Sequence, residues 1–137
     1  MRLLSRREHS CQELCRKLLA RDFDPDTIDA VVAELQADNL LSDERFAESY
    51  VRAKVAKGLG PVRLRRDLRE HRIDDDTIHR YLHERHWHTL AAQVRQKRFG
   101  PALPESFEER ARQMRFLQYR GFESEHINGA MKQDDWD

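Results

Sequence analysis

The 137-residue sequence holds few of the residues that interrupt or cross-link a chain: five glycines, four prolines and two cysteines. Two cysteines cannot build the disulfide framework of a small secreted domain. Cys11 and Cys15 stand one helical turn apart, which is a poor arrangement for a disulfide. We therefore expect free thiols and a reducing, cytoplasmic environment.

Long apolar runs are also missing. No stretch approaches the roughly 18 consecutive apolar residues of a transmembrane helix, and the first residues lack the apolar run of a signal peptide. Hydrophobic residues make up 39% of the chain and charged residues 36%. So many charges cannot be buried unpaired, so the core must be thin. This composition favours an elongated array of small units over one round domain.

The apolar residues that are present recur at three- and four-residue steps, which predicts helices, and no stretch alternates as a strand does. One helix is expected from 43 to about 57, capped by Ser42 or Asp43 and broken by 58–60. Pro61 opens the next helix, and Asp74 to Asp76 start another. Further helices are expected at 87–99, 107–120 and 124–132.

The chain also resembles itself. A shift of fifty positions places Leu14 on Leu64, Leu18 on Leu68 and Ile28 on Ile78. A further shift of forty-nine aligns Leu117 with Leu68 and Ile127 with Ile78. This register predicts an all-α fold of three tandem three-helix modules, at residues 1–40, 41–85 and 86–137. The first module lacks most of its first helix, because that copy is trimmed or because a leading segment is missing.

The formal net charge is zero, but the charges alternate in blocks. Residues 50–72 carry eight basic and two acidic groups, whereas residues 24–49 carry one and eight. Acidic residues at helix starts have a structural explanation, since they cap free amides. Crowded like charges repel, so the basic helices predict an anionic partner. The partner could be a phosphate backbone or an acidic protein surface, because arginine pairs with both.

Several patterns that resemble chemistry have simpler interpretations. His79 and His83 share a helical face, with His86 and His88 nearby, but no third metal ligand is evident. Cys11 and Cys15 could add thiolate ligands only if they came close to these histidines in space. Gly58–Pro61 lacks the length and ending of a phosphate loop. The aromatic residues are interpreted as core rather than as stacking platforms for bases: Trp87, Phe99, Phe107, Phe116, Tyr119 and Phe122. We therefore expect no metal, no cofactor and no enzyme activity.

Four groups of residues, spread over nearly the whole chain, carry a family resemblance. They are Ser5–Ser10 with Glu13-Leu14 and Lys17-Leu18, Asp43–Ala47, Lys57–Pro61 with Leu64 and Leu68, and Arg115–Phe122. In this order and spacing they make a fairly specific signature, although each alone is weak. On these residues the sequence resembles the RecX family of recombination regulators.

The resemblance implies tandem three-helix modules in a curved, elongated body that binds in the groove of a RecA filament on single-stranded DNA. It implies blocked filament extension and reduced ATPase, strand-exchange and co-protease activities, and thereby modulation of DNA repair and the SOS response. We expect a monomer whose main contact surface comprises Lys54, Lys57, Arg63, Arg65, Arg66 and Arg69. The outer modules extend it with Arg16, Lys17, Arg21, Arg115 and Arg120. The alternative is a stand-alone helical protein that binds nucleic-acid phosphates through the same helices.

The sequence departs from the family pattern at two helix ends. The pattern has a glycine where Asp22 and Arg72 stand, whereas Gly121 keeps it in the third copy. Such a position follows a helix end and favours a left-handed backbone, which glycine adopts at little cost. We expect these two ends to be closed differently or to carry mild strain, and negative φ angles at both would refute the left-handed version.

Overall fold

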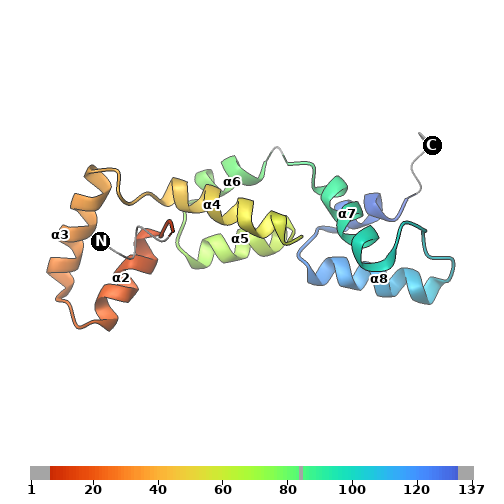
Figure 1. Ribbon diagram of the computed structural model, residues 1–137, viewed down its shortest axis with the longest axis horizontal. Helices are drawn as coiled ribbons and strands as arrows, with labels where there is room; N and C mark the ends of the chain where they lie inside the picture. Colours follow the sequence, from red (N-terminus) through yellow and green to blue (C-terminus); the bar gives the residue numbers. More distant parts are fainter. Residues whose placement is uncertain (1–6, 84, 133–137) are drawn as a thin grey trace. The chain divides into compact units, whose positions relative to one another are not determined.

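The computed structural model describes residues 7–83 and 85–132 (Figure 1). Over these ranges the chain is all α-helical, with eight helices and no strand, which confirms the predicted fold class. The helices are α2 (Cys11–Ala20), α3 (Pro25–Ala37), α4 (Asp43–Ala56), α5 (Pro61–Glu70), α6 (Asp75–Leu82), α7 (Trp87–Phe99), α8 (Phe107–Tyr119) and α9 (Ser124–Ala130). The prediction about the start of the first module falls on residues 1–6, which lie outside the described residues, and the curved, elongated arrangement stays a prediction.

Short polar side chains begin several of the helices. Ser42 Oγ accepts a hydrogen bond from the Arg45 amide at 3.2 Å, so Ser42 is the cap of α4. Asp74 Oδ1 accepts from the Thr77 amide at 2.8 Å in the same way before α6. Each cap satisfies an amide that has no partner within its own helix. The caps therefore fix the helix starts where the sequence predicts them.

Six helices are followed by a residue with a positive φ angle. The φ angles are +64° at Asp22, +58° at Asn39, +81° at Gly58, +56° at Arg72, +93° at Gly100 and +97° at Gly121. After α5, the Ile73 amide donates to the Leu68 carbonyl at 3.0 Å and the Arg72 amide to the Arg69 carbonyl at 2.9 Å, which is the Schellman arrangement. The left-handed version of the prediction at Asp22 and Arg72 is confirmed, with both side chains in a conformation that favours glycine.

The chain divides into two compact units, residues 1–52 with 67–81 and residues 53–66 with 82–137. Helices α4 and α5 therefore each contribute to both units. The predicted module boundaries after residues 40 and 85 rest on the sequence repeat and not on this division into units, and they stay a prediction.

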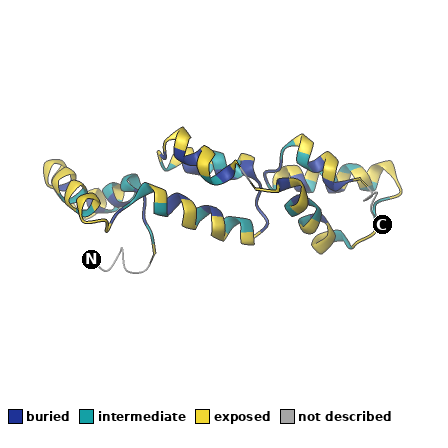
Figure 2. Ribbon diagram, turned by 90° about the horizontal axis from the view of Figure 1, so that it is seen from above, coloured by how far each residue is buried: buried dark blue, intermediate teal, exposed yellow. Residues whose placement is uncertain are grey.

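In the first unit α2 packs against α3, and the burial colouring marks the buried side of each helix (Figure 2). Leu14, Leu18, Ile28 and Leu41 form the buried cluster. A second cluster joins Phe46, Tyr50 and His71, with ring centroids 4.9 to 5.8 Å apart. Small clusters of this kind are what a chain with few apolar residues can build.

In the second unit α7, α8 and α9 pack around Trp87, Leu117, Phe122 and Ile127, all of which are buried. Leu117 and Ile127 occupy the positions that the repeat aligns with Leu68 and Ile78, which are buried as well. The repeated residues are therefore core residues in the parts of the chain where they recur.

Arg95 of α7 is only 2% exposed and has no carboxylate partner among the described residues. Its guanidinium donates to the carbonyl oxygens of Pro101 and Ala102 at 3.3 and 3.2 Å, and to Gln113 Oε1 at 3.4 Å. Burial lowers the pKa of Arg95. Backbone oxygens thus solvate a buried cation, which holds the α7–α8 connection against α8.

Two of the aromatic residues interpreted as core are exposed instead: Phe107 at 84% and Tyr119 at 78%. Phe107 is the first residue of α8 and Tyr119 is its last. Tyr119 follows the buried Leu117 by two residues, which is about 200° around the helix and so on the opposite side. The interpretation of Phe107 and Tyr119 as core residues is therefore wrong, and Leu117 marks the buried side of α8.

Candidate basic surface and cationic pocket

Three predicted arginines share the solvent side of α5. Leu64 and Leu68 are fully buried, and they fix which side of the helix faces the core. Since successive residues turn by about 100°, Arg65, Arg66 and Arg69 lie on the other side. We call these three residues the α5 basic face. Arg66 and Arg69 are exposed and Arg65 is half-buried.

Two residues of this face are paired with carboxylates at long distances. Arg65 Nη1 lies 3.5 Å from Glu123 Oε1, and Arg69 Nε lies 3.3 Å from Asp75 Oδ1. The second pair is well exposed, with 59% of the Arg69 side chain and 80% of the Asp75 side chain accessible. Exposed ion pairs contribute about 0–1 kcal/mol, so a partner's anion can replace these carboxylates at little cost.

The other central residues differ in accessibility. Lys57 is exposed just beyond α4, whereas Lys54 is half-buried within it. Arg63 is half-buried one turn before Arg66, where its backbone and Cβ lie against the turn at Gly121. Its Nε is enclosed and makes no hydrogen bond with any described residue. Arg63 is therefore less accessible than Arg66 and Arg69, although it lines a pocket together with Arg66.

The three predicted residues of the first module lie on α2 or directly after it. Arg16 and Arg21 are exposed. Lys17 is half-buried, and its Nζ donates to Nε2 of the buried His9 at 2.9 Å. Nδ1 of His9 faces the Arg7 carbonyl at 3.1 Å, so Lys17 belongs to a local network. Arg16 and Arg21 are more accessible to a partner than Lys17 is.

The two predicted residues of the third module also differ. Arg115 is exposed on α8. Arg120 is half-buried, and its Nη1 donates to the Lys57 carbonyl oxygen at 3.2 Å. Its guanidinium carbon lies 5.1 Å from the centre of the Phe116 ring. Arg120 is therefore held in place within the second unit, whereas Arg115 projects into solvent.

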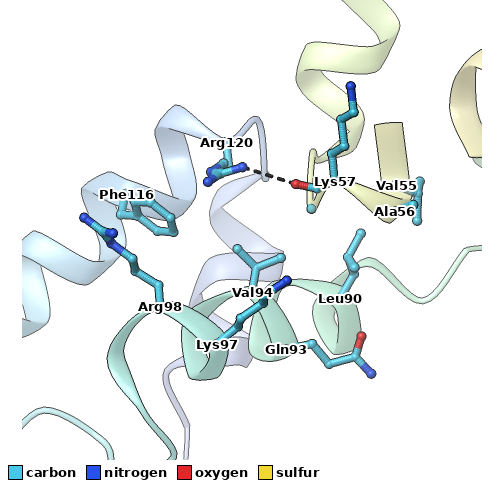
Figure 3. Close-up of a pocket in the computed structure, with 11 residues that line it drawn as sticks. Val55, Ala56, Lys57, Leu90, Gln93, Val94, Lys97, Arg98, Phe116 and Arg120 are labelled. Atoms are coloured by element: carbon cyan, nitrogen blue, oxygen red, sulfur yellow. Dashed lines mark hydrogen bonds between the residues drawn. The ribbon is translucent and has the colours of Figure 1, made fainter. Parts of the chain in front are cut away.

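Arg120 lines a cavity of about 400 Å³ in the second unit (Figure 3). The walls are the end of α4 at residues 55–58, the face of α7 that carries Leu90, Val94, Lys97 and Arg98, and the end of α8. We call this cavity the cationic pocket. Sequence reasoning included Lys57 and Arg120 but missed Lys97 and Arg98, and it assigned Phe116 to the core. The adjacent basic pair before Phe99 was the available signal.

A second, shallower pocket of about 300 Å³ lies beside the start of α5 in the same unit. The exposed ring of Tyr119 lines it together with Val62, Arg63 and Arg66. Tyrosine and arginine are enriched where proteins bind partners. This pocket joins two of the predicted arginines to an aromatic residue that the sequence interpretation had placed in the core.

Cys11 and Cys15 are free, half-buried thiols. Burial, followed by the charge of Asp43, raises the pKa of Cys11 to about 11. Burial also raises the pKa of Cys15, with further contributions from Asp29 and Asp43. At neutral pH Cys11 is therefore almost entirely protonated, and Cys15 carries a smaller thiolate fraction than an ordinary cysteine does.

Among residues 7–83 and 85–132, no three histidine, cysteine or acidic side chains cluster closely enough to hold a metal ion. In the same ranges, no helix has the length and apolar character needed to cross a membrane.

Three family models match consecutive parts of the chain. They describe the first, second and third three-helix domains of RecX and match residues 1–35, 42–82 and 88–131. The chain is 40% identical over 139 residues to the regulatory protein RecX of Halorhodospira halophila, which covers all of this chain and 86% of that protein. It is 42% identical over 124 residues to the regulatory protein RecX of Pseudomonas savastanoi pv. phaseolicola, covering 89% and 80% of the two chains.

Solved structures agree on the fold. A crystal structure of regulatory protein RecX aligns with a TM-score of 0.78 at 23% identity, over 92% of this chain and 64% of that one, so this chain spans somewhat less than two thirds of its length. RecX from Lactobacillus salivarius aligns with a TM-score of 0.77 at 22% identity, over 94% and 87%. Together, the three matched domains and the close relatives show that the chain belongs to the RecX family of regulatory proteins.

Proposed function

We propose that this chain is a monomeric, non-catalytic regulator that binds the RecA–single-stranded DNA filament. Binding inhibits filament extension and the ATPase, strand-exchange and co-protease activities of RecA, and so modulates DNA repair and the SOS response. The α5 basic face makes the central contact, with Lys54, Lys57 and Arg63 beside it. The outer modules contribute Arg16, Lys17, Arg21, Arg115 and Arg120.

The observation that carries this proposal is the α5 basic face itself. Three arginines occupy the side of one helix that faces solvent, although helix formation would be served as well by neutral residues there. The carboxylates near Arg65 and Arg69 are 3.5 and 3.3 Å away, and their side chains are 41% and 80% exposed. A face of this kind keeps its guanidinium groups available to phosphates or carboxylates of a partner.

The repeated modules support binding to a repetitive partner. Basic residues recur on the second helix of each copy, at α2, α5 and α8. Several modest contacts carried by one chain raise the overall affinity well above that of any single contact. A filament supplies equivalent sites along its length, so it suits such a chain better than a small partner does.

A second candidate function is stand-alone binding of single-stranded nucleic acid. The observation that favours it is the exposed Tyr119 ring, which lines the shallow pocket with Arg63 and Arg66. Aromatic rings beside basic side chains stack on unpaired bases and contact the phosphates. This function predicts DNA binding in the absence of RecA, with strong dependence on salt.

The central test measures inhibition of the DNA-dependent ATPase of RecA by the double variant Arg65→Glu, Arg69→Glu. Two charge-assisted contacts of about 1.5 kcal/mol each correspond to roughly a 100-fold higher concentration for half-inhibition. The matched control is Arg52→Glu with Lys132→Glu, which changes the net charge equally at exposed positions elsewhere. Equal inhibition by the two variants would count decisively against the α5 basic face.

A binding measurement separates the two candidate functions. Labelled single-stranded DNA is titrated with the chain, with and without RecA, over a series of salt concentrations. The first function predicts tight association only when RecA is present. Binding of equal strength without RecA, lost steeply as salt rises, would favour the stand-alone nucleic-acid binder.

A further inference from the structure

The cationic pocket has an unusual charge composition. Lys57, Lys97, Arg98 and Arg120 line it, and no aspartate or glutamate of the described chain does. Neither Arg98 nor Arg120 has a carboxylate partner within the described ranges, although the whole sequence contains as many acidic as basic residues. The pocket is therefore a local excess of positive charge in a chain that is neutral overall.

Part of this charge compensates for the ends of helices. The pocket lies at the carboxyl-terminal ends of α4, α7 and α8. Each such end carries a partial charge of about −0.5, so three ends account for roughly −1.5. Four cations exceed this amount and leave a positive balance of about +2.5 for a ligand. Helix-end stabilisation thus explains some of the basic residues, but not all four.

The two guanidinium groups are held in place before any ligand binds. The guanidinium carbons of Arg98 and Arg120 lie 5.6 and 5.1 Å from the centre of the Phe116 ring. The ring itself is fixed by an edge contact with Phe99 at 5.3 Å. Cation–π contacts orient these arginines without neutralising them, so less side-chain entropy is lost when an anion binds.

The other side of the pocket is apolar. Figure 3 shows Leu90 and Val94 between the α4 end and the Lys97 side chain, while Arg98 and Arg120 lie near Phe116. The Lys57 ammonium group points away from these cations, and its carbonyl oxygen accepts the bond from Arg120. The ligand would therefore meet two oriented guanidinium groups, the exposed ammonium group of Lys97 and an aliphatic wall, with Lys57 at the rim.

From these features we propose that the cationic pocket binds a chain of two or more phosphate groups. A single carboxylate would neutralise only one of the clustered cations, whereas linked phosphates place several negative charges within a few ångströms. The volume of about 400 Å³ is in the range of small-ligand sites. The phosphates belong either to a free nucleotide or to a nucleic-acid backbone, and Leu90 and Val94 contact the sugar or base. This site goes beyond both candidate functions above, because neither assigns a phosphate ligand to the cationic pocket.

The test titrates the full chain with three probes at constant ionic strength: sodium tripolyphosphate, ATP without magnesium, and a twelve-residue oligothymidylate. Binding is followed by calorimetry for the two small probes and by fluorescence anisotropy for the oligonucleotide. The double variant Lys97→Gln, Arg98→Gln removes two exposed cations, and we expect roughly 30-fold weaker binding of every probe that binds. The matched control Arg52→Gln, Lys132→Gln should bind as the unmodified chain does.

A second variant separates orientation from charge. Phe116→Leu keeps every cation but removes the ring that positions Arg98 and Arg120, and we expect a threefold to tenfold loss of affinity for tripolyphosphate. Tripolyphosphate that displaces the oligonucleotide identifies a shared site and a nucleic-acid source. Binding of ATP and tripolyphosphate without the oligonucleotide identifies a free nucleotide as the ligand.

Three outcomes would overturn the proposal. The first is no binding of any probe beyond that of sulfate at equal ionic strength. The second is equal binding by the pocket variant and its control. The third is that hexaglutamate binds as tightly as tripolyphosphate and that the pocket variant loses this binding. That result would assign the pocket to an acidic protein segment. The α5 variant changes no residue of the cationic pocket. A loss of RecA inhibition in that variant and a loss of phosphate binding in the pocket variant are therefore independent results.

Discussion

Replacing Gly121 by alanine tests the close approach between the α8–α9 turn and the start of α5. Gly121 has a φ of +97°, and a Cβ atom there would lie 2.5 Å from Cβ of Arg63 and 2.9 Å from its amide nitrogen. The approach is tied by two backbone hydrogen bonds: the Gly60 amide donates to the Arg120 carbonyl at 2.8 Å, and the Val62 amide to the Gly121 carbonyl at 2.9 Å. The α8–α9 turn thus caps the start of α5.

The expected destabilisation has two parts. An alanine in a left-handed conformation costs about 1–2 kcal/mol. The added methyl group cannot fit at 2.5 Å from Arg63, so the turn must move away from α5, at about 1–3 kcal/mol for an overpacked contact. Together these give a loss of about 2–5 kcal/mol in the free energy of unfolding. The loss should be largest for the structure around α5.

Urea denaturation followed by circular dichroism measures the overall loss, and amide hydrogen exchange at Gly60 and Val62 measures the local one. The control is Gly129→Ala in α9, where a Cβ would make only a 3.4 Å contact with Cβ of His88. Alanine favours helix over glycine by up to about 1 kcal/mol, so this variant should be neutral or slightly more stable. If Gly121→Ala unfolds within about 0.5 kcal/mol of the unmodified chain, the close approach to Arg63 is wrong.

Three further predictions concern local structure. Arg72→Gly should stabilise the chain by about 0.5–1 kcal/mol in urea denaturation, because glycine adopts the φ of +56° without strain. The greater flexibility of glycine in the unfolded chain offsets part of this gain. A destabilised variant would contradict this prediction. Ser106→Ala removes the hydrogen bond from the Glu109 amide (3.1 Å) and should cost about 1 kcal/mol, whereas an unchanged urea midpoint would show that the cap contributes nothing. Burial raises the pKa of Glu13, but the hydrogen bond and charge of Arg7 outweigh it, and the net shift is downward from 4.5. The stability from Glu13 is therefore present above pH 4.5 and lost as pH falls through the lowered value, so Glu13→Gln and the unmodified chain should converge in stability in acid but not at pH 7.

The sequence was sufficient for the features that depend on local spacing. The helix starts at Ser42 and Asp74 follow from short polar side chains placed ahead of apolar periodicity. The left-handed positions at Asp22 and Arg72 follow from their alignment with a glycine that closes the equivalent helix. The same reasoning would have found Asn39, since asparagine tolerates this conformation better than most residues.

Features created by tertiary packing could not be found in this way. Arg98 and Arg120 are separated by more than twenty residues and meet only through the Phe116 ring. Arginine usually lies on the protein surface, yet Arg95 is buried, and backbone oxygens accept hydrogen bonds from its guanidinium group. Charge content along the sequence cannot distinguish such an arginine from those of the α5 basic face, because burial depends on which side of the helix meets the rest of the fold.

The protonated thiols of Cys11 and Cys15 have a practical consequence for following this chain in solution. With a pKa of about 11, Cys11 is ionised to only roughly one part in ten thousand at pH 7. A cysteine introduced at an open position such as Tyr119 would carry a far larger thiolate fraction and would react first with a maleimide dye. A cysteine at such a position should therefore take up a fluorophore well ahead of Cys11.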